Sequence, residues 1–273
     1  MKPTLRLAKY WIYVPLIVMA IFYLLPMYVI LVTGFKSFAE IDLKTMWNLP
    51  HGIAFDNYIE AYSKLGPSLW NSFAMVIPAA LVSSMLGSLN GFILAKWKFR
   101  GADVIFPLIL FGMFIPYQSI LIPLVVFMRS VGLTGLVGLA IAHIIYGIPI
   151  TTLTFRNYYA SMPQELLEAA KIDGADMLGI YRYILLPISI PSFVVVLIWQ
   201  FTSAWNDFLF AVVLTGNEQW PITVALNNMA GSQIISWNVQ MAGSLLAALP
   251  TLLVYIFLGR YFLRGLLAGS LKG

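Results

Sequence analysis

Long uninterrupted apolar runs dominate the chain, and they recur at lengths close to the ~20 residues that a helix needs to cross a bilayer. We expect six spanning helices, at about residues 10–33, 69–95, 104–128, 133–155, 185–214 and 241–262. Because the runs are continuous rather than alternating, they favour helices that satisfy their own backbone over the strands of a barrel. The pattern predicts an all-α polytopic membrane protein with one transmembrane domain over residues 1–273.

Composition agrees with this interpretation. The chain is 60% hydrophobic and 10% charged, whereas an ordinary soluble domain is about 25% charged. The first apolar run is too long for a cleavable signal peptide, and it continues through Pro26 without a small-residue cleavage site.

Basic residues set the orientation, because cytoplasmic loops of membrane proteins carry an excess of Lys and Arg. With the N-terminus inside, twelve basic residues fall on the cytoplasmic side: Lys2, Arg6, Lys9, Lys96, Lys98, Arg100, Arg156, Lys171, Arg182, Arg260, Arg264 and Lys272. Four fall outside: Lys36, Lys44, Lys64 and Arg129. We therefore expect a multi-pass protein of the inner or plasma membrane, with both termini and residues 157–184 cytoplasmic. The net charge of +5 then reflects topology, and no basic patch interleaved with aromatics indicates nucleic-acid binding.

Residues for catalysis and metal binding are scarce. The chain has no cysteine and two histidines, which excludes thiol chemistry and leaves no cluster for a metal. It lacks the H-E-x-x-H, G-x-S-x-G and P-loop patterns. We expect neither an enzyme, nor a cofactor, nor ATP binding by this chain itself.

Two features interrupt the regular pattern of spans. The third run contains Pro107, Pro116 and Pro123, and broken helices concentrate where backbone lines a cavity. The first external segment, residues 36–67, mixes charges with Trp47, Pro50 and Gly52, and a short helix is predicted over 56–65.

The cytoplasmic segment 157–184 is charged and helix-forming. Ser161 and Gln164 have the spacing of a capping box, Asp173 and Gly174 end the predicted helix in a left-handed turn, and Asp176 can cap a second helix over 177–185. A water-facing helix, turn and helix between two spans is suited to docking a soluble partner.

This segment resembles a known motif. The pattern Glu168-Ala169-Ala170, Gly174, Ile184, Leu186 and Pro187 is similar to the EAA loop of the permease subunits of ATP-binding-cassette importers. The resemblance implies coupling helices that sit in a groove of a cytoplasmic ATPase. Glu168 would make a polar contact with the ATPase, Ala169 and Ala170 would permit close approach, and Asp173 and Gly174 would turn the chain.

The resemblance extends to other parts of the chain. The C-terminal sequence GRYFLRGLLAGSLKG and the tetrapeptide 205–208, WNDF, resemble carbohydrate permeases of the maltose-importer kind. Residues 217–229, followed by Ser236-Trp237-Asn238 and Met241-Ala242-Gly243, resemble the glucose or mannose type more closely. The family implies a second similar permease, two cytoplasmic ATPase subunits and an external solute-binding protein, forming a heterotetrameric membrane complex to which that binding protein delivers solute.

Polar groups inside spans are costly and usually face a cavity or another helix. The fifth run carries Gln200, Trp205, Asn206 and Asp207, which offer the hydrogen bonds and aromatic faces that bind sugars. Asp207 at the aqueous interface and Trp205 in the aromatic belt is an equally good interpretation. Tyr117 and Gln118, beside Pro116, form a second candidate pair, whereas Asn90 and His143 are better explained as interhelical hydrogen bonds.

The predicted function is sugar import by alternating access, driven by the partner ATPases. Two alternatives remain: a self-sufficient secondary transporter or channel, which should show inverted repeats, and a same-family permease for a non-sugar solute. No repeat is found, and the spans lack the acids of a polyamine pathway and the midplane bases of a phosphate pathway.

Overall fold

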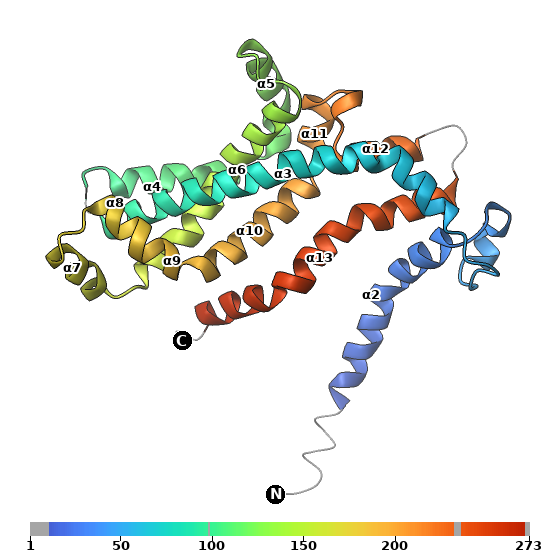
Figure 1. Cartoon of the computed structure of the whole chain (residues 1–273), viewed down its shortest axis with the longest axis horizontal. Helices are drawn as coiled ribbons and strands as arrows, with labels where there is room; N and C mark the ends of the chain where they lie inside the picture. The colour runs from blue at the N-terminus through green and yellow to red at the C-terminus, as the bar shows by residue number, and fades with distance from the viewer. Residues whose placement is uncertain (1–10, 98, 232–235, 271–273) are drawn as a thin grey trace, which may run out of the picture. The chain divides into compact units, whose positions relative to one another are not determined.

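The protein is almost entirely helical. The computed structural model describes residues 11–97, 99–231 and 236–270, with side chains as far as residue 261, and within those residues every regular element is a helix (Figure 1). The longer helices are α2 (Tyr13–Gly34), α3 (Asp56–Lys96), α4 (Ala102–Phe111), α5 (Tyr117–Ser130), α6 (Gly135–Ala160), α7 (Gln164–Ile172), α10 (Ile190–Trp205), α12 (Ile222–Ala230) and α13 (Trp237–Ser270). Shorter ones are α8 (Met177–Gly179), α9 (Leu186–Ile188), α11 (Leu209–Leu214), the 3₁₀ turns η1 (Phe38–Glu40), η2 (Leu43–Thr45), η3 (Gly112–Phe114) and η5 (Asn217–Gln219), and the π-helical η4 (Ile180–Leu185).

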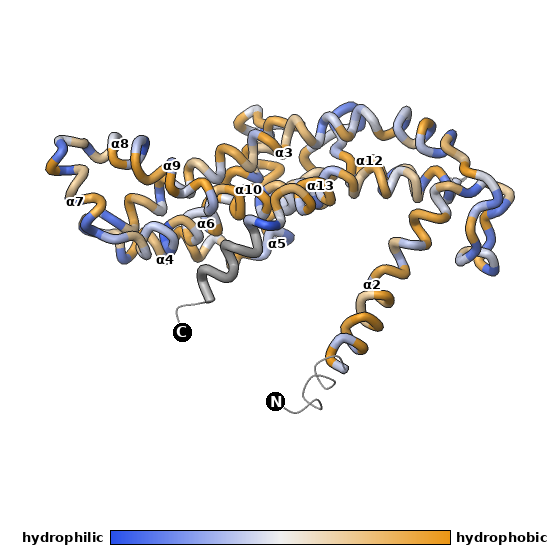
Figure 2. Tube along the Cα trace, turned by 60° about the horizontal axis from the view of Figure 1, so that its bottom comes forward, coloured by the Kyte–Doolittle hydropathy of each residue, from blue (hydrophilic) through white to orange (hydrophobic). Residues whose placement is uncertain are grey.

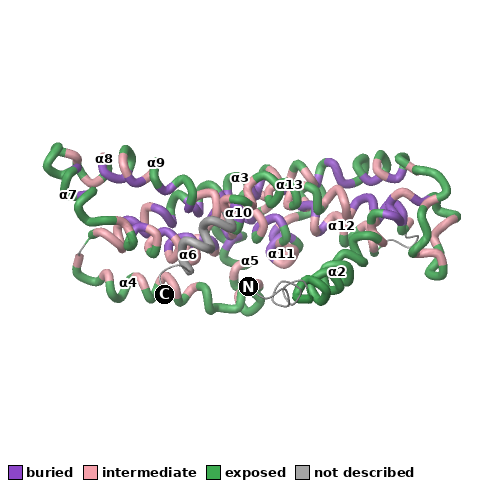
Figure 3. The backbone as a smooth tube through the Cα atoms, turned by 90° about the horizontal axis from the view of Figure 1, so that it is seen from below, coloured by how far each residue is buried: buried purple, intermediate pink, exposed green. Residues whose placement is uncertain are grey.

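Four of the described helices are long and apolar enough to cross a membrane, and the number rises to six if each of two bent helix pairs is one span. The first, α2, is apolar over most of its length (Figure 2) and largely exposed (Figure 3), as a lipid-facing helix would be, except at its C-terminal end, where Val32, Thr33 and Gly34 are buried. The prediction of an all-α polytopic membrane protein is confirmed.

The third and fifth predicted spans are broken helices instead of straight ones. Helices α4 and α5 meet at an angle of 100° around Pro116, where Ile115 and Pro116 both have extended backbone. Since the residue before a proline is driven out of the helical region, the break follows from the sequence. The segment 177–188 meets α10 at 76°, and α10 ends at Trp205, well before the predicted boundary at residue 214.

The predicted short helix over 56–65 and the predicted second span over 69–95 are one helix of 41 residues, α3. Gly66 and Pro67 do not end it. A helix this long measures about 62 Å, roughly twice the thickness of the bilayer core, so one part of it lies outside the hydrocarbon.

The chain divides into two compact units, one of residues 1–66 and 226–249 and the other of residues 67–225 and 250–273. In the first unit, buried Asn57 forms a node. Its Nδ2 donates to the carbonyls of Gly34 (2.9 Å) and Lys36 (2.8 Å), and its Oδ1 accepts from Nδ2 of Asn238 (2.8 Å). Beside it, Ala61, Val239 and Ala242 make a small buried cluster.

In the second unit, α6 is the central helix and packs against α4, α10 and α11. It also touches α3 closely, because Gly87 and Gly91 remove side chains at the crossing. A Cβ on Gly91 would lie 2.6 Å from the amide nitrogen of Arg156. Thr151 of α6 donates across the same crossing to the carbonyl of Ser83 (3.0 Å). Small residues at a helix crossing are the usual means of close packing in membranes.

Some predicted features lie outside the described residues. They include Tyr10, at the start of the first predicted span, and the last three residues of the C-terminal motif. They also include five basic residues, Lys2, Arg6, Lys9, Lys98 and Lys272. The side chain of Arg264 is not described.

Candidate functional site

The segment between α6 and α10 begins with an elbow, defined here as α7, the turn 173–176 and α8. Helix α7 ends in a Schellman motif: the amide of Ala175 donates to the carbonyl of Ala170 (2.9 Å), and the amide of Gly174 donates to that of Lys171 (3.1 Å). Gly174 has φ +83°, the left-handed conformation predicted from the sequence. A Cβ at Gly174 would meet nothing within 4 Å, so the glycine is required by backbone conformation rather than by space.

The second half of the elbow is capped as predicted. Asp176 precedes α8 with extended backbone, and its Oδ1 accepts from the amide of Gly179 at 2.8 Å. The start of α7 differs from the prediction, because Pro163 is the capping residue and Ser161 instead donates to the carbonyl of Tyr158 (2.7 Å). A proline at the cap presets φ, and no side-chain cap forms.

The elbow has one buried side and one exposed side. Leu167 and Ala170 are buried in a core cluster with Phe155, Tyr159 and Tyr181. The rest of that cluster consists of Phe92, Ile180, Leu185 and Val196. Ala170 is therefore small because it packs against this chain's own core, which differs from the partner contact that the motif implied for it.

The exposed side presents Glu168, Ala169 and Ile172. Glu168 and Ile172 are four residues apart and so share one face of α7. Ile172 is 86% exposed, the most exposed large apolar side chain of the elbow. Lys171 is next to the Trp97 ring, with its Nζ 5.8 Å from the ring centroid.

A network of four hydroxyl groups connects η4, the segment that follows the elbow, to the long helices. Tyr181 donates to Ser88 (3.0 Å), Ser88 and Tyr159 share a hydrogen bond of 2.7 Å, and Tyr159 donates to Ser189 (3.1 Å). Ser189 in turn donates to the carbonyl of Leu186 (3.0 Å). All four hydroxyl-bearing residues are buried. They come from η4, α3, α6 and the break before α10, so the network ties four elements together.

Sequence reasoning did not identify this network. The two tyrosines and two serines are common residue types, and their pairing spans up to 93 residues of chain. Tyr181 lies in the π-helical segment η4, and such turns are frequent at functional sites. A π-helix has no clear sequence pattern, so this feature is visible only in the structure.

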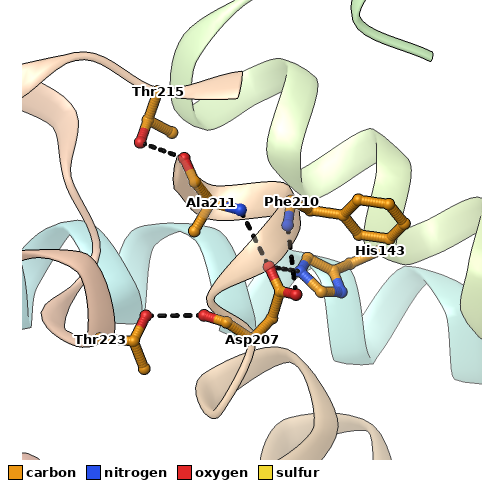
Figure 4. A network of polar contacts seen from close by, with 6 residues as sticks. All are labelled: His143, Asp207, Phe210, Ala211, Thr215 and Thr223. Atoms are coloured by element: carbon orange, nitrogen blue, oxygen red, sulfur yellow. Dashed lines mark hydrogen bonds and ion pairs between the residues drawn. The ribbon is translucent and has the colours of Figure 1, made fainter. Parts of the chain in front are cut away.

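The second candidate region is the turn between α10 and α11, around Asp207 (Figure 4). The carboxylate of Asp207 accepts from the amides of Phe210 (3.4 Å) and Ala211 (3.0 Å), and thus caps α11. The Asp207 carbonyl accepts from the hydroxyl of Thr223 at 2.6 Å. On its other side, Nε2 of His143 lies 3.4 Å from Oδ2 of Asp207, with both side chains about nine-tenths buried.

Aromatic rings surround this turn. Phe210 is buried, and the rings of Tyr146, Tyr117 and His143 lie 5.1, 5.6 and 5.8 Å from it, all edge to face. The structure thereby brings Tyr117, at the start of α5, beside the Asp207 turn, two sites that the sequence suggested separately. The sequence predicts an interhelical hydrogen bond for His143; in the structure its Nε2 faces the carboxylate of Asp207, which lies in the turn between α10 and α11, and makes no hydrogen bond within the part of the chain that the structure describes.

The other predicted pathway residues divide into buried and exposed ones. Gln200 is buried, and its Nε2 donates to the carbonyl of Gly147 (3.0 Å). Trp205 is 2% exposed and stacks on Phe201, at 5.4 Å between ring centroids. Asn206, Tyr117 and Gln118 are exposed. These three are the exposed members of the predicted set.

Comparison with known proteins places the chain in a family. A family model described as the inner membrane component of binding-protein-dependent transport systems matches residues 87–267, which include the elbow and the Asp207 turn. The chain belongs to this family. It is the permease subunit of an ATP-binding-cassette importer and a multi-pass membrane protein.

Several relatives align along nearly the whole chain. A probable ABC transporter permease of Pyrococcus horikoshii is 48% identical, over 97% of this chain and 98% of the relative. The xylose/arabinose import permease protein XacI of Haloferax volcanii is 37% identical, over 90% of this chain and 87% of its own length. The glucose import system permease protein GlcU of Saccharolobus solfataricus is 33% identical, over 100% and 98%.

The fold is also similar to a solved structure. One chain of a bacterial ABC transporter involved in the import of the acidic polysaccharide alginate has a TM-score of 0.82 and 23% identity, covering 96% of this chain and 99% of that chain. This match supports the fold of the importer permease.

Proposed function

We propose that this importer permease carries a neutral sugar across the membrane, and that its elbow receives the motion of a partner ATPase. In this proposal the chain pairs with a second, similar permease, two cytoplasmic ATPase subunits and an external solute-binding protein. Both termini and the elbow face the cytoplasm. ATP is hydrolysed by the partner subunits, and the permeases alternate between inward-open and outward-open states.

The single observation that carries the coupling role is the two-sided elbow. Leu167 and Ala170 fix α7 to the core of the second unit, so the helix is held against the spans. The opposite side leaves a carboxylate, Glu168, and an apolar side chain, Ile172, open to solvent on one face. An exposed apolar residue beside a charge is the composition of a protein contact with a small hydrophobic centre and a polar rim.

A capture experiment tests the coupling role. The chain is solubilised together with its candidate ATPase, and the ATPase recovered is measured for the wild type, Glu168→Ala, Ile172→Ala and the control Glu60→Ala. Glu60 is an exposed glutamate in the first external segment, where its carboxylate contacts Lys64. We expect both elbow substitutions, and not Glu60→Ala, to weaken ATPase recovery. Equal recovery from all four proteins would contradict the coupling role.

Transport assays extend the test. Glu168→Lys and Gly174→Asp should abolish uptake in reconstituted vesicles while leaving the permease pair assembled. Normal uptake by these variants would eliminate the elbow as the coupling element.

The sugar class is supported by the relatives named for xylose, arabinose and glucose import. The exposed pathway candidates agree with it, since Tyr117 offers an aromatic face and Gln118 and Asn206 offer amides, which are the groups that hold polyols. Trp205, Asp207 and Gln200 would act indirectly, by shaping the turn that holds Asn206.

A substrate screen decides this part of the proposal. The reconstituted complex with its solute-binding protein is supplied with pentoses, glucose, an amino acid and a phosphate ester, and stimulation of ATP hydrolysis is measured. We expect stimulation by a pentose or hexose alone. Stimulation only by the amino acid or the ester would favour a same-family permease for another solute, and uptake without any ATPase would favour a secondary transporter.

A further inference from the structure

The segment between α2 and α3 folds back along the membrane helix that precedes it. The hydroxyl of Tyr28, in α2, donates to the carbonyl of Trp47 at 2.8 Å. Tyr28 is six residues before Gly34, the last residue of α2, which corresponds to about 9 Å along the helix axis. The backbone at Trp47 is therefore level with the last two turns of a helix whose whole length is needed to cross the bilayer.

Further hydrogen bonds hold the segment in this position. Lys36 is 2% exposed, and its Nζ donates to the carbonyls of Thr45 (2.8 Å) and Met46 (3.4 Å). The base of the loop is closed by the amide of Ala54, which donates to the carbonyl of Phe35 at 3.0 Å. The ammonium group of Lys36 is thus occupied by backbone carbonyls inside the loop, and the fold-back is built into the segment.

The surface of this loop is unusually apolar for a connecting segment. Leu43 is 86% exposed and Leu49 is 70% exposed. The complete set of large, exposed apolar side chains in the segment is Phe38, Leu43, Trp47, Leu49, Ile53 and Phe55. Exposed apolar surface of this kind marks a contact with another molecule or with a membrane.

We propose that residues 38–55 form an interfacial anchor that lies in the headgroup region of the leaflet reached by the C-terminal end of α2, which is the outer leaflet in the orientation proposed above. The depth of Trp47, beside the last two turns of α2, favours lipid over a soluble partner. A soluble protein would approach from the water and would meet the C-terminal end of α2 first. Helix α2, to which the loop is bonded through Tyr28, is itself apolar on its exposed surface, where Leu24, Met27 and Leu31 are exposed. Tryptophan together with lysine is also the composition of membrane interfaces.

Spin labelling tests the anchor directly, because the chain contains no cysteine. A nitroxide is attached to Leu43→Cys, to Leu49→Cys and to the control Lys44→Cys, and each chain is then assembled into its complex in lipid vesicles. Lys44 is the neighbour of Leu43 and is an exposed, charged residue. Power saturation compares collisions with dissolved oxygen, which concentrates in lipid, and with a nickel chelate, which stays in water.

We expect the ratio of oxygen to nickel collisions to be several-fold higher at positions 43 and 49 than at position 44, with or without the solute-binding protein. Equal ratios at the three positions would overturn the proposal, because the loop would then lie in water. Loss of both kinds of collision at 43 and 49 only when the binding protein is added would also overturn it and assign the surface to protein docking. Since none of these readings requires transport, they are independent of the sugar and of the ATPase coupling.

Discussion

The buried hydroxyl network predicts an unusual order of mutant stabilities. Ser88 is the acceptor for Tyr181 and the partner of Tyr159. Ser88→Ala therefore leaves the Tyr181 hydroxyl buried with no partner in the network. Tyr181→Phe removes that hydroxyl altogether, and Ser88 keeps its bond to Tyr159. The double variant Ser88→Ala/Tyr181→Phe removes both partners, leaving no orphan between them.

The expected losses in free energy of unfolding differ among the three variants. An interhelical hydrogen bond in a membrane contributes on average about 0.6 kcal/mol, which is the expected cost of Tyr181→Phe. An unsatisfied buried hydroxyl costs about 1–3 kcal/mol, which is the expected cost of Ser88→Ala. Because the second substitution removes the orphan, the double variant should be no less stable than Ser88→Ala alone, and its cost should be smaller than the sum of the single costs.

Unfolding in mixed micelles with increasing anionic detergent, followed by helical circular dichroism, measures the three free energies. Ser84→Ala is the matched control, since Ser84 is a buried serine of α3 that lies outside the hydroxyl network. We expect it to cost less than Ser88→Ala. Additive single costs in the double variant would refute the reasoning, because they would show that the two hydroxyls do not depend on each other.

Substitutions at three more positions follow from the geometry. Gly87→Ala should cost about 1–3 kcal/mol by overpacking, because its Cβ would lie 2.8 Å from the carbonyl carbon of Thr151; unchanged unfolding in mixed micelles would contradict this. Gly174→Ala should lower the free energy of unfolding by about 1–2 kcal/mol, because alanine is strained in the left-handed conformation. Gly174→Asn should lower it by less in the same assay, because asparagine adopts that conformation more readily. Asp207→Ala should destabilise the permease by about 0.5–2 kcal/mol, and Asp207→Asn by less; equal unfolding of the two variants would show that the cap is unimportant.

Local features of the candidate site could be predicted from the sequence. The left-handed turn at Gly174 and the cap at Asp176 each depend on a few neighbouring residues, so their residue types were sufficient evidence. The break at Pro116 is local for the same reason, because a proline constrains itself and the residue before it. The apolar runs predicted where long apolar helices lie, since the length of such a run is visible in sequence, but they did not show that two of the runs are bent helix pairs.

Features that depend on distant contacts could not be predicted. Gln200 reads as a pathway residue in sequence, yet its amide is used by the carbonyl of Gly147, 53 residues away. Trp205 reads as a sugar platform or an interface residue, yet it is buried against Phe201. Ala170 reads as a small surface residue for a partner, yet it faces the chain's own core. In each case the residue type fits both roles, and only the packing separates them.

Helix α10 links the two candidate regions of the second unit. It begins beside Ser189, a member of the hydroxyl network, and it ends at the turn that Asp207 caps. Between those breaks lie 16 helical residues, a rod of about 24 Å. A helix with a break at each end can tilt as one body, whereas a continuous span would have to bend. At the start of this rod, Ser189 accepts from Tyr159, and Tyr159 is linked through Ser88 to Tyr181 of η4, the segment that follows the elbow. In the coupling role proposed above, a displacement of the elbow would be carried through these contacts to the Asp207 turn. The rings of Tyr117, His143 and Tyr146 lie around Phe210 at that far end, and they are the groups that such a tilt would move first.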